Sequence, residues 1–467
     1  MARIVIVGAG VAGLAAALAT AREGHDVLVL EGSAPPPEGP VEEVASRWHR
    51  LAVPQARHTH SLTSLGVQAL RARAPDVLDA LLEVGAPLLD LTRSAPHDQQ
   101  PDDPDLVALG CRRTVLELVL HRAVRDTAGV VFRYNDPVRG VSIGADRRVT
   151  AVLLDGVTVA ADLVVDATGR RGRARDWLIA AGQSVPPDRV VPTKQLILGR
   201  FYRRPGPLRA LNRGNAAGVV SDHYIGVLHP GDCEHFSVAI GLPLRDKAFS
   251  AVREPAVFDA VAAATPWVGD WFADGRAVPV SGVGVLGSPP NRLGGLAIDP
   301  APPVAGVVQV GDAACVTDPT FGRGMSLALV HGLGLADLVA ETSGDDLMAR
   351  AARFAADLYE PWFEHAAAES TDRLRRLRQA ALGDAGSGGA PTGLRAVGLA
   401  ATRDPVVWHG LTRVLMGLDR PDLFDKPAFA ARVSTALAEY RGVVPRGAPT
   451  RAELVDVIAR TSRVVSH

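Results

Sequence analysis

Cysteine, lysine and aromatic residues are scarce in this chain of 467 residues, and it has no long hydrophobic run. The three cysteines, Cys111, Cys233 and Cys315, are far apart and form no C-x-x-C pair, which argues against a disulfide scaffold, a zinc site and an iron–sulfur cluster. No stretch approaches the ~20 uninterrupted apolar residues of a membrane-spanning helix, and the first residues do not form the apolar core of a signal peptide. We therefore expect a soluble, cytoplasmic protein.

The charge balance and the length define the broad class. Lysine and arginine total 50 residues against 51 aspartates and glutamates, so a net charge of −1 gives no electrostatic reason to bind nucleic acid or an anionic membrane. Hydrophobic residues make up 47% of the chain, which is ordinary for a protein with a large core. At about 150 residues per domain, the length predicts two or three domains.

A dinucleotide-binding pattern occupies the first 31 residues. Ile4–Val7 is a β-branched run typical of a buried parallel strand, and the G-x-G-x-x-G motif of residues 8–13 follows it directly. An Ala-rich segment over residues 14–22 predicts a helix, and a second apolar strand over residues 26–30 ends at Glu31. A glycine motif alone is weak evidence, but this order of strand, motif, helix, strand and acid is typical of a Rossmann unit.

Each residue of this pattern has a physical role. Gly8 allows the tight turn, Gly10 lets backbone N–H groups approach a pyrophosphate, and Gly13 lets the helix pack on the strand. The phosphates then lie at the positive end of the helix. Glu31 is expected to accept hydrogen bonds from the hydroxyls of the adenosine ribose.

A second G-x-G-x-x-G sequence, at residues 282–287, lacks the elements around it. Ser288-Pro289-Pro290 follows it, and no helix can begin there to receive a phosphate. We predict a strand or loop at this place and a single dinucleotide-binding unit in the chain. A nicotinamide cofactor would therefore bind without a Rossmann unit of its own.

Another glycine-bearing turn follows a predicted strand at Val307–Val310. Gly311-Asp312 places a carboxylate at the C-terminal end of that strand, where α/β sheets bind ligands. Residues 318–326, which read DPTFGRGMS, then open a helix predicted over Met325–Glu341. The positive start of that helix would stabilise the negative charge of a reduced flavin.

These motifs occur in the order seen in one group of flavoproteins. With the glycine motif and Glu31, Arg113 at the start of a helix, the segment Asp166-Ala167-Thr168-Gly169 and the turn of residues 311–324, the chain resembles the para-hydroxybenzoate-hydroxylase-like family of FAD-dependent monooxygenases. The stretch Val53–His60 looks more like the bacterial natural-product branch of that family, which includes polyether epoxidases. The resemblance covers roughly residues 1–60, 105–180 and 300–340.

The resemblance implies FAD as the cofactor and a set of residues that bind it. Arg113 would contact the pyrophosphate or the ribityl chain, Asp312 the ribityl hydroxyls, and Pro319–Ser326 would line the isoalloxazine. The residues expected to bind FAD are Gly8, Gly10, Val11, Ala12, Gly13, Glu31, Gly32, Arg113, Val138, Ala167, Thr168, Gly169, Gly311, Asp312, Pro319, Gly322, Gly324, Met325 and Ser326. No catalytic side chain is identified, because the chemistry centres on the flavin; His58, Pro319, Gly322 and Gly324 are the candidates that line it.

The resemblance also implies a monooxygenase reaction. Reduced flavin and O₂ would form a C4a-hydroperoxide that hydroxylates or epoxidises an apolar small molecule in bacterial secondary metabolism. The electrons would come from NADPH or NADH, or from a partner flavin reductase. Two alternatives stay open: a redox-neutral cyclase that uses FAD as a scaffold, and a flavin-dependent halogenase, which the absence of a W-x-W-x-I-P motif disfavours.

The expected fold class is α/β, with three parts. A Rossmann-type FAD-binding domain takes residues 1–75, 105–182 and 304–345, and an inserted α+β substrate domain takes residues 76–104 and 183–303. A helical C-terminal region spans residues 346–467. Within it we expect a solvated basic helix face at Arg373–Arg378 and a Gly/Ala/Ser loop at Gly383–Gly393.

His58 and His60 alternate along the chain and would share a face of an extended segment. Metal ligands can be spaced in this way, but no cysteine or carboxylate pair lies nearby in the sequence, so we expect no metal. The two histidines are expected to form hydrogen bonds near the flavin or to line its entrance.

Overall fold

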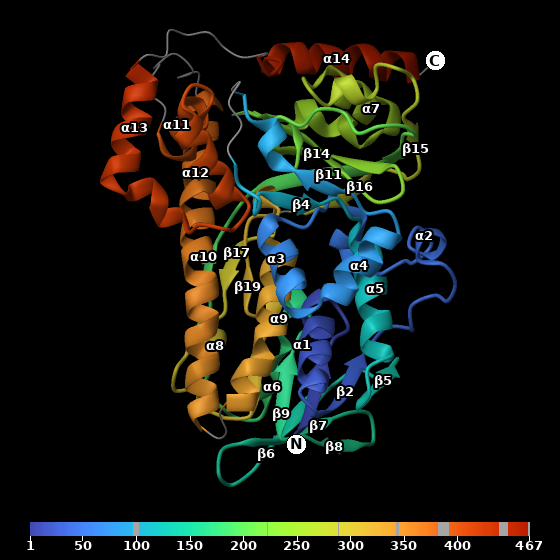
Figure 1. Cartoon of the computed structure of the whole chain (residues 1–467), viewed down its shortest axis with the longest axis vertical. Helices are drawn as coiled ribbons and strands as arrows, with labels where there is room; N and C mark the ends of the chain where they lie inside the picture. The colour runs from blue at the N-terminus through green and yellow to red at the C-terminus, as the bar shows by residue number, and fades with distance from the viewer. Residues whose placement is uncertain are drawn as a thin grey trace.

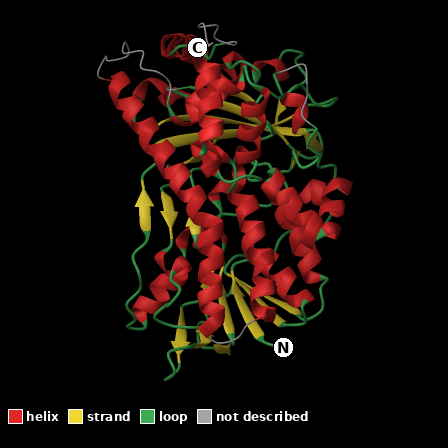
Figure 2. Cartoon of the chain, turned by 60° about the vertical axis from the view of Figure 1, so that its left-hand side comes forward, coloured by secondary structure: helices red, strands yellow, loops and turns green. Residues whose placement is uncertain are grey.

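Figure 1 shows the computed structural model, which describes residues 1–96, 102–221, 223–287, 289–341, 345–381, 392–438 and 447–465. A five-stranded parallel sheet lies at one end of the molecule and an antiparallel sheet lies at the other. The long helix α10 (Asp345–Ala381) runs along the molecule between these two ends, as Figure 2 also shows.

The parallel sheet has the strand order β18-β9-β1-β2-β5. Alternate residues of its strands enter two different cores, so both faces are buried, as a continuous apolar run predicts. Helices α1, α5 and α9 cover one face, and helix α6 with a small antiparallel sheet covers the other. The elements are β1 (Arg3–Val7), β2 (Asp26–Glu31), β5 (Val130–Tyr134), β9 (Leu163–Asp166), β18 (Val307–Gln309), α1 (Val11–Arg22), α5 (Arg113–Arg125), α9 (Gly324–Glu341), α6 (Arg173–Ala180), β6 (Gly140–Ile143), β7 (Val149–Leu153) and β8 (Thr158–Ala160).

The antiparallel sheet has the order β12-β13-β14-β11-β15, and β16 also pairs with β11. Its outer face packs Leu198, Val238 and Ile240 against helices α7 and α14. Its other face bears a smaller apolar cluster that includes Ile197 and Leu286. The elements are β11 (Gln195–Arg203), β12 (Ala217–Val220), β13 (Ile225–Pro230), β14 (His235–Pro243), β15 (Val278–Pro279), β16 (Gly284–Leu286), α7 (Pro255–Ala264) and α14 (Arg451–Val465).

Other elements pack beside the two sheets or between them (Figure 1). Helix α4 packs Val77 and Leu81 into the core around α1, whereas Leu89 and Ala108 of the β3–β4 hairpin pack against helices α11, α12 and α13. The segment 76–104 thus contributes to cores other than that of the antiparallel sheet, and the proposed domain bounds stay a prediction. These elements are α2 (Val41–Val44), α3 (Ser64–Arg73), α4 (Pro75–Glu83), β3 (Leu88–Asp90), β4 (Val107–Leu109), β10 (Arg189–Val191), β17 (Asn291–Leu293), α8 (Gly295–Ile298), β19 (Cys315–Val316), α11 (Gly393–Ala401), α12 (Pro405–Leu415) and α13 (Pro427–Ala438).

The predicted fold class is confirmed: a Rossmann-type parallel sheet is joined to an antiparallel sheet and to C-terminal helices. The second G-x-G-x-x-G sequence forms β16, which pairs with β11, so the predicted strand or loop is confirmed there. Most of the predicted loop at Gly383–Gly393 lies outside the described residues, and α11 begins at Gly393.

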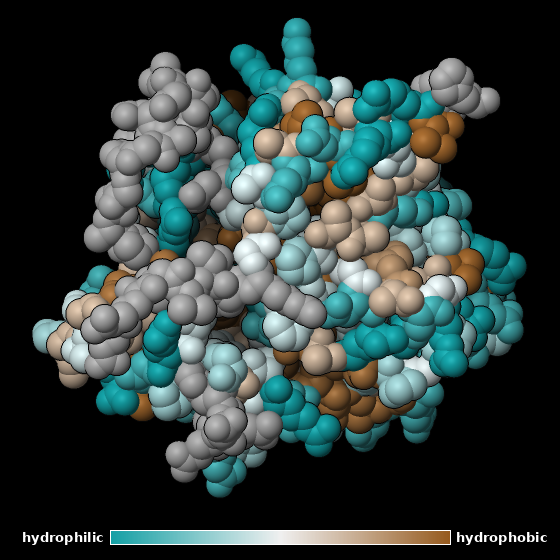
Figure 3. Space-filling view, turned by 90° about the horizontal axis from the view of Figure 1, so that it is seen from above, coloured by the Kyte–Doolittle hydropathy of each residue, from teal (hydrophilic) through white to brown (hydrophobic). Residues whose placement is uncertain are grey.

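The end of the molecule that bears α14 has a mixed surface. Figure 3 shows that apolar residues on this face are interspersed with hydrophilic ones. Among the described residues, no helix combines the length and the apolar composition needed to cross a membrane.

Candidate cofactor and active site

The glycine loop after β1 is shaped by close backbone contacts. A Cβ atom on Gly8, whose φ is +110°, would lie 2.5 Å from the carbonyl oxygen of Ala167 at the end of β9. A Cβ atom on Gly13 would lie 2.0 Å from the carbonyl oxygen of Gly8. Both positions require glycine for the fold itself.

Gly10, by contrast, faces open space at the first turn of α1. A Cβ atom there would meet only the side chains of Arg113 and Glu117, each at 4.0 Å. No side chain caps the helix, which begins at Val11, so its first N–H groups are directed at this space. A helix start with an arginine beside it attracts an anionic group such as a pyrophosphate.

We call the open space at Gly10, between the start of α1 and Arg113, the cradle. Glu31 lies beside the cradle at the end of β2. Its carboxylate accepts hydrogen bonds from the backbone N–H groups of Ala9 and Ser33, both at 2.9 Å, and Arg50 lies 3.5 Å away. A carboxylate has about four lone-pair positions, so Glu31 can still accept hydrogen bonds from ribose hydroxyls.

A buried carboxylate joins the two arginines of the cradle. Glu117 lies 2.8 Å from Arg50 and 2.9 Å from Arg113. Burial alone would raise the pKa of Glu117, but the charges of Arg50 and Arg113 overcome it and hold the pKa below its usual value. Glu117 therefore stays ionised and fixes both guanidinium groups.

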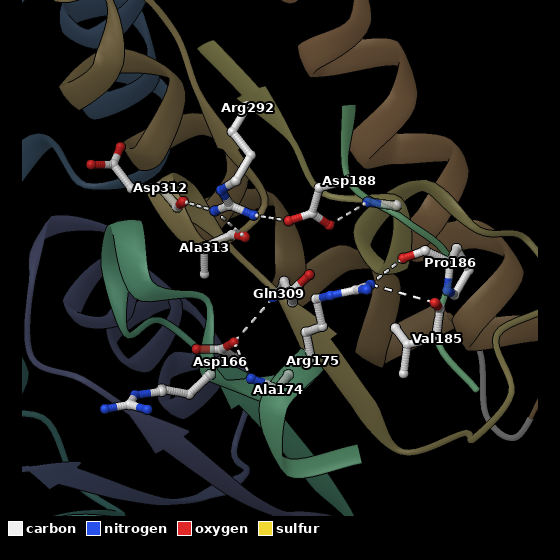
Figure 4. A network of polar contacts seen from close by, with 12 residues as sticks. Asp166, Ala174, Arg175, Val185, Pro186, Asp188, Arg292, Gln309, Asp312 and Ala313 are labelled. Atoms are coloured by element: carbon white, nitrogen blue, oxygen red, sulfur yellow. Dashed lines mark hydrogen bonds and ion pairs between the residues drawn. The ribbon is translucent and has the colours of Figure 1, made fainter. Parts of the chain in front are cut away.

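The next turn follows β9 and is organised by Asp166. Its carboxylate accepts hydrogen bonds from the N–H and the hydroxyl of Thr168, from the N–H of Ala174 and from the amide of Gln309, at 2.6–3.1 Å (Figure 4). The buried carboxylate thus holds the chain where Gly169, with φ +68°, opens the 3₁₀ turn of Gly169–Arg171.

A third turn, Gly311–Ala313, follows β18. It is held in place by Arg292 and Asp188, which we call the clamp. Arg292 donates to the carbonyl oxygens of Asp312 and Ala313 at 2.6 and 2.9 Å, and Asp188 pairs with Arg292 at 3.2 Å. Figure 4 shows the carboxylate of Asp312 directed away from this clamp. The clamp fixes the backbone and leaves the side chain of Asp312 available.

The available carboxylate of Asp312 lies close to the glycine cradle. A Cβ atom on Gly311 would lie 2.5 Å from the Cβ of Ala12 in α1, so the two turns touch. Arg170 Nε lies 3.8 Å from the carboxylate, which accepts no hydrogen bond from a described residue. Asp312 is therefore placed to bind the hydroxyls of a ligand that also occupies the cradle.

The last turn contains the 3₁₀ segment Pro319–Phe321 and leads into α9. Gly322 and Gly324 are both exposed, and a Cβ atom on either would have no neighbour within 4 Å. The backbone at these two glycines is therefore open to close approach by a flat ring, next to the start of α9.

Buried Asp318 holds this turn in place. It accepts hydrogen bonds from the N–H of Thr320 at 2.9 Å and from the hydroxyl of Ser370 at 3.0 Å, and it pairs with Arg373. The expectation of a solvated face at Arg373 is wrong, because this side chain turns inward from α10 to neutralise Asp318. Thr320 also donates to Gln195 of β11 at 3.0 Å, which ties the turn to the antiparallel sheet.

Met325 and Ser326 follow the turn and are buried. The hydroxyl of Ser326 accepts hydrogen bonds from the N–H and the hydroxyl of Thr63, at 3.2 and 2.7 Å. The side chain of Ser326 thus points at the start of α3 and not at the open space, which leaves its backbone for any contact with a ligand.

His58 lies against the antiparallel sheet. A Cβ atom on Gly199 would lie 2.9 Å from its Nδ1, and one on Gly284 would lie 3.6 Å from its Nε2. Burial, assisted by the charge of Arg170, lowers the pKa of His58 to about 4, and burial lowers the pKa of His60 to about 3. Both imidazoles are neutral at physiological pH.

Two predicted residues lie at the edge of this region. A Cβ atom on Gly32 would lie 3.8 Å from the Cβ of Pro137, and Val138 packs partly buried against the core on the other face of the parallel sheet. Within the described ranges, no group of three histidine, cysteine, aspartate or glutamate side chains is arranged to hold a metal ion.

The arrangement fits FAD at several points. The open cradle at Gly10 suits a pyrophosphate, Glu31 a ribose, the available carboxylate of Asp312 a ribityl chain, and the open backbone at Gly322 and Gly324 a flat ring. These groups come from turns far apart in the sequence, and the parallel sheet brings them to one edge.

Several residues that build this site were not predicted from the sequence: Arg50, Glu117, Arg170, Asp188 and Arg292. Only Glu117 carried a usable signal, because it follows Arg113 by four residues on a predicted helix and so shares its face. The others lie in loops or short strands, where the sequence gives no spacing rule.

Comparisons with known proteins agree with this geometry. Residues 3–36 match the FAD binding domain family. Protein Rv3254 of Mycobacterium tuberculosis (strain ATCC 25618 / H37Rv) is 28% identical over 359 residues, which cover 69% of this chain and 70% of that protein.

Solved structures share the fold more widely than the sequence. PqsL, a probable FAD-dependent monooxygenase from Pseudomonas aeruginosa, matches 82% of this chain and 99% of its own, with a TM-score of 0.61 and 17% identity. The chain has the fold of FAD-dependent monooxygenases. A triple mutant of the flavin-dependent brominase Bmp2 (TM-score 0.60, 17% identity, 94% and 99% of the two chains) and the Diels-Alderase PyrE3 (TM-score 0.56, 18% identity, 90% and 81%) have it too.

The predicted resemblance to FAD-dependent monooxygenases is therefore confirmed at the level of the fold. A flavoprotein monooxygenase fold also carries halogenation and cycloaddition, as the names of Bmp2 and PyrE3 state, so the reaction of this chain has to be argued from its own residues.

Proposed function

We propose that the chain is an FAD-dependent monooxygenase that hydroxylates or epoxidises an apolar small molecule. The observation that carries the proposal is the convergence of the Gly10 cradle, the available Asp312 carboxylate and the open turn at Gly322 and Gly324 on one edge of the sheet.

The side chains of this region bind and orient rather than react. Arg113 and the start of α1 would hold the pyrophosphate, and Asp312 the ribityl hydroxyls. FAD, when bound, supplies the redox chemistry with O₂. His58 and His60, being neutral, offer hydrogen bonds at fixed places without adding charge beside the ring.

The proposal places an apolar substrate against the face of the antiparallel sheet that bears Ile197. Ile197, Ala239 and Leu286 form a small cluster there, with Val227 packed against it. Ile197 and Gly199 lie on the same face of β11, and His58 contacts that face at Gly199. Thr320 is hydrogen-bonded to Gln195 at the start of the same strand. This bond links the apolar cluster on β11 to the turn that contains Gly322 and Gly324.

The electron source belongs to the proposal as well. Within the part of the chain that the structure describes, one strand–glycine motif–helix unit of the dinucleotide-binding kind is present, at β1, α1 and β2. NADPH or NADH would therefore dock transiently outside a Rossmann unit, or a partner flavin reductase would deliver the electrons. A role in bacterial secondary metabolism agrees with the biosynthetic pathway named for PyrE3.

Replacement of Asp312 tests the cofactor site. Asp312→Ala leaves ligand hydroxyls without their acceptor, which costs about 1–3 kcal/mol and raises the Kd for FAD roughly tenfold or more. Asp176→Ala, in an exposed position on α6, is the matched control and should leave the Kd unchanged. An unchanged Kd in Asp312→Ala would remove this residue from the site.

The reaction is tested by comparing aerobic and anaerobic turnover. With NADPH or a reductase present and a panel of apolar aromatic and alkene compounds, product should form only with O₂ and should contain one oxygen atom from ¹⁸O₂. The fold of PyrE3 favours the redox-neutral cyclase as the second candidate, and an equal product yield without O₂ would establish it. A product that appears only when halide is added would instead identify a halogenase.

A further inference from the structure

A small pocket opens at one end of the antiparallel sheet, beyond the residues that build the cofactor site. It lies where β11 and β13 begin and β14 ends, and Arg373 of α10 lines one side of it. Its volume is about 20 Å³. A single water molecule needs roughly 10–15 Å³, so the pocket admits one small polar group and not a whole ligand.

The side chains that line the pocket offer hydrogen-bond donors. Lys194, directly before β11, forms no ion pair with a described residue, and Arg373 uses only Nη2 to pair with Asp318. The hydroxyl of Tyr224, a residue that is 2% exposed, has no hydrogen-bond partner in the described part of the chain. No described acidic side chain lines the pocket. Donors and positive charge in this arrangement suit a carboxylate or a phosphate group.

The backbone holds Lys194 in an unusual conformation. Its φ is +48°, in the left-handed region that a residue with a side chain rarely adopts. The residues on either side are bonded to other segments: Thr193 donates to the carbonyl oxygen of Pro289 at 2.9 Å, and Gln195 accepts from Thr320 at 3.0 Å. Such strain persists only where the surroundings impose it, and it is concentrated at ligand sites.

The pocket borders the apolar cluster of the proposed substrate site. Ile225 and Gly241 line the pocket and lie opposite each other on β13 and β14, and Ile197 of β11 lies opposite Gly241 on the other side. Residues paired in this way share one face of the sheet, so Ile197 of the cluster stands next to the pocket. A ligand with its polar group in the pocket would therefore place its apolar part against the cluster.

We propose that the substrate is an apolar molecule with one carboxylate or phosphate group, and that Lys194 and Arg373 bind this group in the pocket. The inference rests on the proposed function, which supplies the reaction at the apolar part of the molecule. Because the charge of Arg373 is compensated by Asp318, Lys194 provides the charge that selects an acid over a neutral analogue.

The test compares acids with neutral analogues on the FAD-loaded protein by isothermal titration calorimetry. The probes are ω-phenylalkanoates of increasing chain length and their primary amides, which match them in size. The wild type should bind its best acid about tenfold more tightly than the corresponding amide, and Lys194→Met should remove that difference by weakening the acid alone.

Two further variants separate charge from structure. Lys194→Arg should restore the preference for the acid, because it keeps the positive charge. Lys247→Met, at an exposed lysine of the 3₁₀ segment Lys247–Arg253, is the matched control and should bind both probes like the wild type. If Lys194→Met does not fold, the salt dependence of the wild type decides: added salt should weaken the acid and leave the amide unchanged.

Equal Kd values for acid and amide in the wild type, or a folded Lys194→Met that keeps the preference, would overturn the inference. Inorganic phosphate that binds alone as tightly as the best acid would also overturn it, because the pocket would then hold a free anion. These binding measurements do not depend on turnover. Failure to bind FAD, or to oxygenate any compound, would instead overturn the proposed function.

Discussion

Single residues of the glycine motif have separable roles in this structure. Gly8 and Gly13 are fixed by backbone contacts inside the protein, and any side chain there would push β1, β9 or α1 apart. Gly10 has room for a side chain as far as the protein is concerned. Under the proposed function, glycine is needed at this position for the approach of the pyrophosphate. This difference can be tested without disturbing the fold.

Gly10→Val should abolish FAD binding and leave the protein folded, because the new side chain occupies the cradle where the pyrophosphate approaches α1. Gly282→Val, in the second glycine sequence, is the matched control, since a Cβ there has no neighbour within 4 Å. The measurements are the Kd for FAD and the thermal midpoint of unfolding. FAD binding of normal strength by Gly10→Val would show that the cradle is not used.

Burial keeps several histidines in the interior of the protein neutral. The pKa values are lowered to about 3 or 4 at His58, His60, His121, His229, His331 and His365. In the unfolded chain these groups take up a proton below about pH 6.5, and in the folded chain they do not. Their contribution to stability is therefore complete above pH 6.5 and is lost as the pH falls.

His331, which is 3% exposed and bonded to the hydroxyl of Tyr359, is suited to test this. Each such histidine costs about 1.4 kcal/mol of unfolding free energy per pH unit below 6.5. Between pH 7 and pH 5, His331→Gln should therefore lose about 2 kcal/mol less than the wild type in urea unfolding. Parallel pH profiles of the two proteins would contradict a neutral, buried His331.

At the scale of elements, the turn from Asp318 to Gly324 has two positions, Gly322 and Gly324, where an added side chain would begin in open space. Gly324→Leu meets no protein atom within 4 Å of its Cβ and should fold normally. It should retain FAD through the cradle and Asp312, but lose substrate oxidation or release hydrogen peroxide, because the ring edge is displaced. Gly398→Leu, on the distant helix α11 and equally open, is the control. Normal coupling of electron use to product formation in Gly324→Leu would place the ring elsewhere.

The sequence predicts elements well where a long apolar pattern defines them. The strands predicted over Ile4–Val7 and residues 26–30 and the helix predicted over Met325–Glu341 differ from β1, β2 and α9 by at most one residue at either end. Strands of two or three residues, such as β10, β15 and β19, were not predicted, because so short a segment shows no periodicity.

The residues of the candidate site also divide into those that follow a recognisable sequence pattern and those that do not. The glycine motif, Asp312 and the turn around Gly322 were predicted because each glycine or acid follows a recognisable strand. Arg50 and Arg292 were not, because their roles depend on distances between loops that only the folded sheet sets. The inward turn of Arg373 likewise depends on the rotation of α10 against Asp318.

At the scale of the whole molecule, a buried ion pair connects the two sheets. Arg112, which precedes α5, donates to Asp232 in the turn between β13 and β14 through its backbone N–H and its guanidinium, at 2.6–3.1 Å. Both side chains are buried, and Arg112 also donates to Ser46 at 2.7 Å. The pair fixes the antiparallel sheet relative to the cradle.

Asp232→Ala should destabilise the protein by about 3–5 kcal/mol, because it leaves the guanidinium of Arg112 buried without its carboxylate. Asp155→Ala, which removes the exposed partner of Arg139, is the matched control and should unfold like the wild type. Chemical denaturation followed by tryptophan fluorescence measures both. Equal stability of the two variants would show that the sheets are held together without this pair.

The central claim, that the edge of the parallel sheet binds FAD, is tested most directly by the absorbance spectrum of the purified protein before and after denaturation. The account predicts a yellow protein with a flavin spectrum. Because the proposed contacts with FAD are all non-covalent, denaturation should release about one FAD per chain. Protein purified without flavin should take up added FAD and acquire the same spectrum. A folded, colourless protein that fails to bind added FAD would contradict the account.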